Sequence, residues 1–309
     1  MKRFLTIVIL FFIIFVFDTK IFGDSIYNLY DKYVNDHKTK IVSNEHILNK
    51  NKYYTENLSS YVKETDNYTI NNKEELFNIY YTAINKGFDK LTFYCTNSYY
   101  SCMDDINNLD KEENNFSYIN QLVNTFNTYS TIESTYSSNG RVDIKINKKY
   151  SEEDIKRIDE EINNIIIKLD INSYSDINDK IKVFHDYIAG INKYDSEMAE
   201  KGESKYHSDS AIGTLFEGKS ICSGYTDTMS IFLDKLNIKN TRIATEKHVW
   251  NAVYLDNKWY HIDLTWDDPV TSDGRDIILY HYYMLDTDEL LSKDDEDHNF
   301  NKDVYNFIN

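Results

Sequence analysis

The chain has little positive charge, few cysteines and few long apolar segments. It carries 34 Lys and Arg against 51 Asp and Glu, which gives a net charge of −17. That balance argues against nucleic acid or an anionic membrane surface as a partner, because both are polyanions. The cysteines form no CxxC pair, which argues against a structural zinc site. We therefore expect no nucleic-acid partner, no metal and no cofactor.

The longest apolar run stands at the N-terminus. Residues 1–3 are basic at two positions, and residues 4–17 are apolar apart from Thr6. A membrane-spanning helix needs about 20 such residues, so this run is short for a span. A basic start, a short apolar run and a polar sequel are typical of a secretory signal peptide, here residues 1–23, with an uncleaved N-terminal anchor as the alternative. Either case predicts a secreted or extracellular chain that meets a membrane only through an uncleaved N-terminal segment.

The expected secretion affects how the cysteines are paired. An oxidising compartment favours a disulfide between Cys95 and Cys102, and the alternative is two buried thiols. The bond would close a small loop and stabilise the fold by about 2–3 kcal/mol. Pairing these two residues leaves Cys222 as a free thiol.

Cys222 stands at the predicted start of a helix. Ser220 and Ser223 flank it and are both candidate N-caps. Unpaired N–H groups at a helix start favour a thiolate, but only by about 0.3–1 kcal/mol. A thiol with a pKa of about 8.5 requires more than that, so we expect an imidazolium beside it. The helical face is formed by Met229, Phe232, Leu233 and Leu236.

A predicted β-hairpin supplies the histidine. Residues 249–255 and 259–264 are rich in aromatic and β-branched residues, and Asp256-Asn257-Lys258 separates them. Side chains alternate along a strand, so a turn with an even number of residues puts His248 and Asp263 on one face. An odd turn puts them on opposite faces. In the first case Asp263 would hold the imidazole in the tautomer that faces sulfur.

Three segments now resemble a known family. Residues 218–225 (GKSICSGY), 248–251 (HVWN) and 259–266 (WYHIDLTW) resemble the transglutaminase-like superfamily, and the most similar pattern is its bacterial, papain-like branch. The resemblance covers about the last third of the chain. It implies a catalytic triad of Cys222, His248 and Asp263. Animal transglutaminases carry tryptophan after the nucleophile, whereas this chain has Ser223, which argues against a protein cross-linker.

The expected architecture is α+β, and the resemblance implies its last part. A papain-like, transglutaminase-like core, with a helical part and an antiparallel sheet, would occupy residues 151–309 as the catalytic domain. A small α/β domain at 59–150 would precede it, after a polar helical spacer at 24–58. Tyr194 and Trp250 are the residues that we expect to contact substrate.

Other side chains admit a different chemistry. His261 lies two residues from Asp263, so with His248 it would complete a metal site of two histidines and one carboxylate. That arrangement leaves Cys222 unexplained, and we favour the triad. His207 and His298 have no partner that the sequence identifies. The acidic residues after Pro269 contain no twelve-residue calcium loop and are expected to form a solvated face.

The sequence thus predicts an exported, thiol-dependent acyl-transfer enzyme. We expect a cysteine peptidase or amidase that acts on protein or cell-wall peptide amides. One alternative is a transglutaminase that cross-links protein glutamine. The other is a non-catalytic surface module that keeps the fold for binding.

Overall fold

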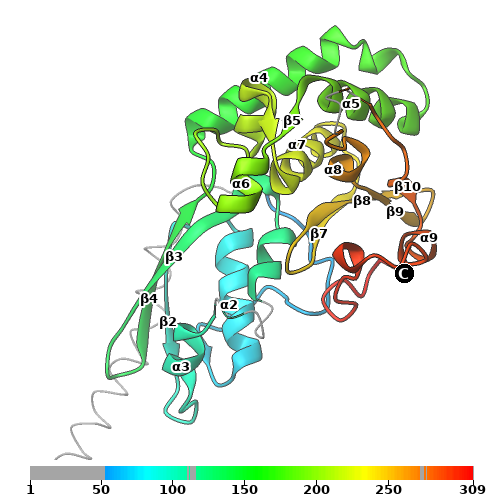
Figure 1. Ribbon diagram of the computed structural model, residues 1–309. Coiled ribbons are helices and arrows are strands. Elements are labelled where there is room, and N and C mark those ends of the chain that lie inside the picture. Colours follow the sequence, from blue (N-terminus) through cyan, green and yellow to red (C-terminus); the bar gives the residue numbers. More distant parts are fainter. Residues whose placement is uncertain (1–52, 110, 112–115, 272–274, 276, 309) are drawn as a thin grey trace, which may run out of the picture. The chain divides into compact units, whose positions relative to one another are not determined.

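The computed structural model of the chain describes residues 53–109, 111, 116–271, 275 and 277–308 (Figure 1). These residues form one compact unit with helices and mainly antiparallel sheets, so the fold is α+β. Residues 1–23, the expected signal peptide or anchor, lie outside the described part, and so does most of the expected spacer. Residues 53–58, the described end of that spacer, are not helical. In the described ranges no helix is long and apolar enough to cross a membrane.

Helices and strands are mixed along the chain. The strands are β1 (Thr69–Ile70), β2 (Lys90–Cys95), β3 (Tyr129–Tyr136), β4 (Arg141–Lys148), β5 (Lys193–Tyr194), β6 (Lys219–Ser220), β7 (Asn240–Ala244), β8 (Val249–Leu255), β9 (Lys258–Ile262) and β10 (Tyr283–Leu285). The α-helices are α2 (Lys73–Asn85), α3 (Cys102–Asn107), α4 (Glu152–Lys168), α5 (Ile177–Ile191), α6 (Ser196–Lys201), α7 (Cys222–Lys235), α8 (Leu264–Asp267) and α9 (Thr287–Leu291). Short 3₁₀ turns are η2 (Phe116–Gln121), η3 (Thr125–Asn127), η4 (Ile171–Ser173) and η6 (Glu296–His298), and η5 (Gly213–Glu217) is a π-helical turn.

The first sheet has the order β1-β2-β4-β3. Its β1 runs parallel to β2, and the other pairs are antiparallel. The long hairpin of β3 and β4 is visible in green in Figure 1, with α2 in cyan beside β2. Helix α2 begins where the Asn72 side chain accepts the N–H of Glu75 at 2.9 Å, a hydrogen bond that caps the helix.

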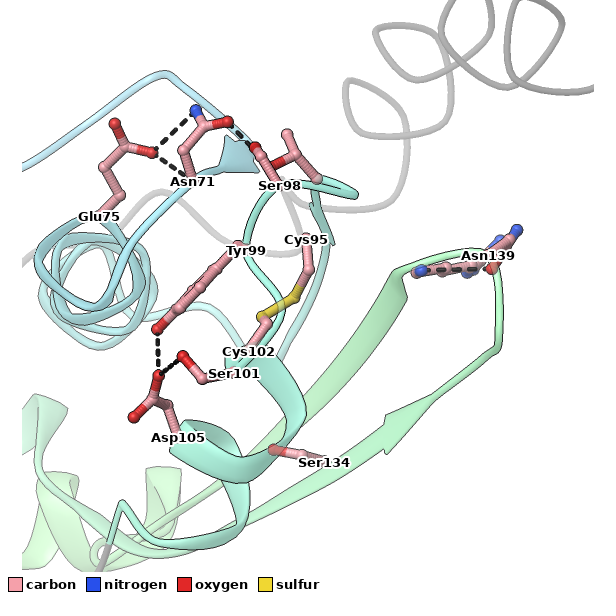
Figure 2. Close-up of a disulfide and its surroundings, with 12 residues drawn as sticks. Asn71, Glu75, Cys95, Ser98, Tyr99, Ser101, Cys102, Asp105, Ser134 and Asn139 are labelled. Carbon is pink, nitrogen blue, oxygen red and sulfur yellow. Dashed lines mark hydrogen bonds between the residues drawn. A yellow bond between two sulfur atoms is a disulfide. The ribbon is translucent and has the colours of Figure 1, made fainter. Parts of the chain in front are cut away.

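A disulfide closes the end of β2 onto α3. Cys95 and Cys102 are bonded, with their Cα atoms 6.2 Å apart, so the predicted pairing is confirmed (Figure 2). Beside the bond, Asp105 accepts hydrogen bonds from the hydroxyls of Tyr99 and Ser101, both at 2.8 Å. The bond and this small network hold the short helix α3 at the end of β2.

The second sheet has the order β10-β9-β8-β7 and is antiparallel throughout. Helix α7 packs against β7 and β8, and α5 packs against α7. The rings of Phe184 and Phe232 stack between these two helices with centroids 3.7 Å apart. Helix α4 starts with a capping box, in which Ser151 and Asp154 each accept the other's N–H. This helical layer fixes α7, and α7 fixes the free cysteine.

One buried core extends over both halves of the described chain. It joins residues of α2 and the first sheet, such as Leu76 and Phe93, with residues of the second sheet, such as Ile243 and Trp250. A second core lies among α4, α5, α7 and the sheet. The division into domains at residue 150 stays a prediction.

Candidate active site

Cys222 is the first residue of α7, and its side chain is partly exposed. The helix begins there because Ile221 is extended, with φ −112° and ψ −178°. The Ile221 carbonyl accepts the N–H groups of Gly224 and Tyr225 at 3.0 and 3.2 Å. The first N–H groups of a helix have no partner within it, so they favour negative charge on the sulfur.

The expected serine cap of this helix is wrong. Ile221 holds the N-cap position and makes no side-chain cap hydrogen bond. Ser220 lies in β6, where its hydroxyl bonds to Thr214 Oγ1 at 2.7 Å, and Ser223 is already inside the helix. The backbone anchors the helix start instead, because the Ile221 N–H donates to the Ser208 carbonyl at 2.8 Å.

The β8–β9 hairpin brings the histidine and the aspartate together. Asp256 and Asn257 have φ of 49° and 65°, and Leu255 pairs with Lys258, so the turn has two residues. This even number puts His248 and Asp263 on one face. His248 Nε2 lies 2.5 Å from Asp263 Oδ2, so the predicted geometry is confirmed.

Four donors saturate the Asp263 carboxylate. Asp263 caps α8, and its Oδ1 accepts the N–H groups of Thr265 and Trp266 at 2.9 and 3.2 Å. Its Oδ2 contacts His248 Nε2 at 2.5 Å and His298 Nε2 at 2.8 Å. A carboxylate only accepts, so both Nε2 atoms must carry hydrogen. The Nδ1 atom of His248 is thereby left for the thiol.

Electrostatics favour a charged pair of the His248 imidazole and the Asp263 carboxylate. Burial disfavours the imidazolium of His248, but the Asp263 carboxylate and a hydrogen bond with Cys222 outweigh it and raise the pKa of His248 to about 10. Burial likewise disfavours the Asp263 carboxylate, and the charge and hydrogen bonds of His248 and His298 outweigh it and lower the pKa of Asp263. Both shifts favour the ionised forms at neutral pH.

A pocket of about 270 Å³ opens onto Cys222 and His248. Its walls come from η2 and from the connection between β7 and β8. A substrate that entered this pocket would meet both groups. The other lining residues are Ser117, Tyr118, Gln121, Ala244, Thr245, Glu246, Lys247 and Val249.

The two expected substrate contacts have different environments. Tyr194 is half-buried, and burial together with negative charge at Cys222 and Asp263 raises the pKa of its hydroxyl, but it is not among the residues that line the pocket. Trp250 is 1 % exposed, and its ring stacks on His248 with centroids 5.7 Å apart. That burial leaves Trp250 no surface for a substrate, so its contribution is to pack behind the imidazole.

The alternative metal set of His248, His261 and Asp263 does not assemble. His261 Nδ1 accepts the Trp250 indole N–H at 3.0 Å, and His261 Nε2 lies 3.2 Å from Thr287 Oγ1. Burial and the nearby His298 lower the pKa of His261 to about 3. Among the described residues, the metal-type ligands that do cluster are His248, Asp263 and His298, within 4.8 Å of one another. The distances from Asp263 to the two histidines are hydrogen-bond lengths, so shared protons account for this cluster.

His298 is the residue that the sequence analysis missed. We expected it to be an ordinary polar residue, yet it is 1 % exposed and bonds to Asp263. Its Nδ1 lies 2.6 Å from Oδ1 of Asp295, which we had assigned to a solvated acidic face. The only local signal is their spacing of three residues. His207, by contrast, is exposed and pairs with Glu217 at 2.9 Å.

Comparison with known proteins adds little. No family model and no curated protein sequence matches the chain. One solved structure that resembles it is described as a TGase, with 18% sequence identity and a TM-score of 0.35. The likeness covers 48% of this chain and 47% of that one, so the chain spans about half the length of its structural neighbour.

Proposed function

We propose that this protein is a thiol-dependent acyl-transfer enzyme with a transglutaminase-like core. Cys222 is the nucleophile, His248 is the base and acid, and Asp263 orients His248. The observation that supports this is the contact of His248 Nε2 with Asp263, which leaves the other ring nitrogen to Cys222 at the start of α7. Nucleophile, base and orienting group in this relation define a triad by geometry.

The first half of the reaction acylates the thiol. Cys222 thiolate attacks the carbonyl carbon of an amide, and the carbonyl electron pair moves to oxygen. The N–H of Cys222 is one donor for that oxyanion. His248 then gives its Nδ1 proton to the leaving amine as the C–N bond breaks, which leaves a thioester and a neutral imidazole.

The second half regenerates the thiol. Neutral His248 takes a proton from water, and the hydroxide attacks the thioester. The carboxylic acid leaves, and the proton held by His248 restores the ion pair with Cys222. Water as acceptor makes the protein a cysteine peptidase or amidase. A lysine amine as acceptor would make it a cross-linking transglutaminase, which Ser223 after the nucleophile disfavours.

The place of action and the substrate form part of the same proposal. The Cys95–Cys102 disulfide supports export, because such bonds persist in oxidising compartments. We propose that the enzyme acts outside the cytoplasm on amides of surface proteins or cell-wall peptides. The pocket at Cys222 has both apolar and polar walls, and Gln121, Thr245 and Glu246 offer hydrogen-bonding groups to a peptide or carboxamide.

The decisive experiment measures the rate of iodoacetamide labelling of Cys222 against pH, on the chain without residues 1–23. Cys95 and Cys102 are bonded, so labelling reports Cys222 alone. We expect fast labelling well below pH 8 that slows at least tenfold in His248→Ala. A rate that rises only near an ordinary thiol pKa of about 8.5, unchanged in His248→Ala, would leave a non-catalytic binding module.

Turnover then separates hydrolysis from cross-linking. Peptide and glutamine-amide substrates are incubated with and without a lysine analogue, and the products are separated by mass. Free acid as the main product supports a peptidase or amidase, and amine adducts support a transglutaminase. Cys222→Ala, checked for its fold by circular dichroism, is the control for activity that does not depend on the thiol.

A further inference from the structure

Asp263 is shared between two histidines, and only one of them faces the thiol. His248 and His298 approach the same oxygen, Oδ2, at 2.5 and 2.8 Å. On its far side, His298 Nδ1 meets Asp295 Oδ1 at 2.6 Å. The four side chains form a row that alternates acid and base, from Asp295 through His298 and Asp263 to His248.

The hydrogen bonds of this row define the charge of His298. Each of its ring nitrogens faces a carboxylate oxygen, and a carboxylate has only acceptors. With both carboxylates ionised, both nitrogens must carry hydrogen for both bonds to form, which is the imidazolium form of His298. The ring is 1 % exposed, and it stacks on Tyr282 with centroids 4.7 Å apart. Water therefore has little access to this cation.

Among the groups around His248, His298 is the competing cation that shares its carboxylate. Asp263 at the start of α8, Cys222 at the start of α7 and His298 in η6 approach the imidazole. Glu246 and Lys247 precede it in the loop after β7, and both line the pocket. Around His298 itself are Asp263, Asp295, His261 and the hydroxyl of Tyr282, which donates to Asp295 Oδ2 at 3.1 Å.

We propose that His298, kept cationic by Asp295, shares the Asp263 carboxylate with His248 and thereby limits how firmly His248 holds its proton. His298 touches neither thiol nor pocket, so it is a positioning and tuning residue. The inference deepens the proposed function and rests on it. A base that receives the thiol proton must also release it to the leaving amine, and an undivided ion pair with Asp263 would slow that release.

Two substitutions remove the same charge by different routes. His298→Gln keeps an N–H donor for Asp263 and removes the cation. Asp295→Asn keeps an oxygen toward the backbone N–H and Nδ1 of His298 but removes the negative charge that favours the cation, so the ring loses its second proton more readily. In both variants we expect the proton affinity of His248 to rise about tenfold, because a like charge nearby disfavours the charged form. His207→Gln, at an exposed histidine outside the site, is the matched control.

The measurement is a histidine NMR titration of His248 in full-length chains that also carry Cys222→Ala. Removing the thiol isolates the effect of His298, and the readout does not depend on whether Cys222 is a nucleophile. Failure of the proposed function appears in the iodoacetamide experiment instead. The His248 resonance is assigned from its loss in His248→Ala, and the amide spectrum of each variant shows that it is folded.

The outcomes are distinct. A higher pKa of His248 in His298→Gln and in Asp295→Asn, with no change in His207→Gln, supports the proposal. An unchanged or lower pKa in the two variants overturns it and leaves His298 as a packing residue. A rise in one folded variant alone also contradicts it, since both remove one cation. If His298→Gln does not fold, Asp295→Asn decides.

Discussion

At the scale of single residues, the acceptor positions of one carboxylate control the site. Two backbone N–H groups of α8 fix Oδ1 of Asp263, so the orientation of the carboxylate does not depend on either histidine. Oδ2 is then directed at His248, and the tautomer of that ring follows. The negative charge of Asp263, beyond its shape, keeps the imidazole protonated.

Asp263→Asn removes the negative charge and keeps the shape of the side chain, so it tests the two contributions separately. The amide oxygen can still accept from Thr265, but its NH₂ group opposes the N–H of His248. We expect the pKa of His248 to fall from about 10 toward its usual value of about 6.5. The imidazolium, present below the pKa of His248, is then lost as pH rises through neutrality instead of near pH 10. Iodoacetamide rates against pH and kcat measure this, with an expected loss of about 10²–10⁴ in kcat.

A matched control for this prediction is Asp288→Asn, an exposed position in α9. It removes a carboxylate charge from an exposed position instead of a buried one, and it should leave both the labelling profile and kcat unchanged. If the pH at which the imidazolium is lost stays near 10 in Asp263→Asn, Asp263 does not set the charge of His248.

Four side chains make up the candidate site, namely Cys222, His248, Asp263 and His298. Sequence alone could predict the first three. Cys222 has a helix start beside it, and His248 and Asp263 have a hairpin between them, so local patterns identify them. His298 is 35 residues from Asp263 in the chain and lies in a three-residue 3₁₀ turn. No periodic pattern describes so short a turn, and its contact depends on how the chain after β10 folds back.

At the scale of elements, α7 and the β8–β9 hairpin depend on two different kinds of signal. The hairpin could be predicted, because Asp256 and Asn257 tolerate positive φ and so set a two-residue turn. The cap of α7 could not, because Ile221 is held by a backbone bond to Ser208, a contact from another loop. Tertiary packing replaces the side-chain cap there.

Gly224 is where that packing is closest. A Cβ atom at Gly224 would lie 2.4 Å from the Ser208 carbonyl oxygen and 2.5 Å from Ser220 Oγ. We expect Gly224→Ala to lower the free energy of unfolding by about 1–3 kcal/mol, although alanine favours helices. Because the clash is two residues from Cys222, the labelling rate of the thiol should also change. Urea denaturation measures the stability.

Gly190 in α5 provides the control. A Cβ there meets nothing within 4 Å, so Gly190→Ala should be neutral or stabilise by up to about 1 kcal/mol. Equal effects of the two substitutions would show that the contact with Ser208 does not constrain the start of α7.

At the scale of the whole molecule, a buried ionic cluster joins segments from both sides of residue 150. Asp227 of α7 accepts from Lys149 Nζ at 2.9 Å, from Tyr150 hydroxyl at 2.6 Å and from Arg242 at 2.8 Å. Arg242 of β7 also donates to the Asn120 and Val123 carbonyls. The wall of the thiol pocket formed by η2 is thus bound to the sheet that carries His248.

This cluster predicts that the segments before and after residue 150 unfold together. It also predicts that Asp227 is needed for the stability of that unit. Asp227→Ala leaves Arg242 buried without its carboxylate, so we expect a loss of about 3–5 kcal/mol in the free energy of unfolding at pH 7. Burial opposes the Asp227 charge, but Lys149 and Arg242 outweigh it and lower its pKa. A lowered pKa stabilises the fold above the unfolded value of about 3.9, and this stability is lost as pH falls through the folded pKa. The difference between wild type and Asp227→Ala should therefore shrink in acid.

The control is Asp159→Ala, which breaks a half-exposed pair with Lys235 and should cost at most about 1 kcal/mol. Tryptophan fluorescence reports the second sheet, and hydrogen exchange reports the first. Coincident transitions would show that the two halves fold together, whereas separate transitions would restore the boundary at 150 as a domain boundary.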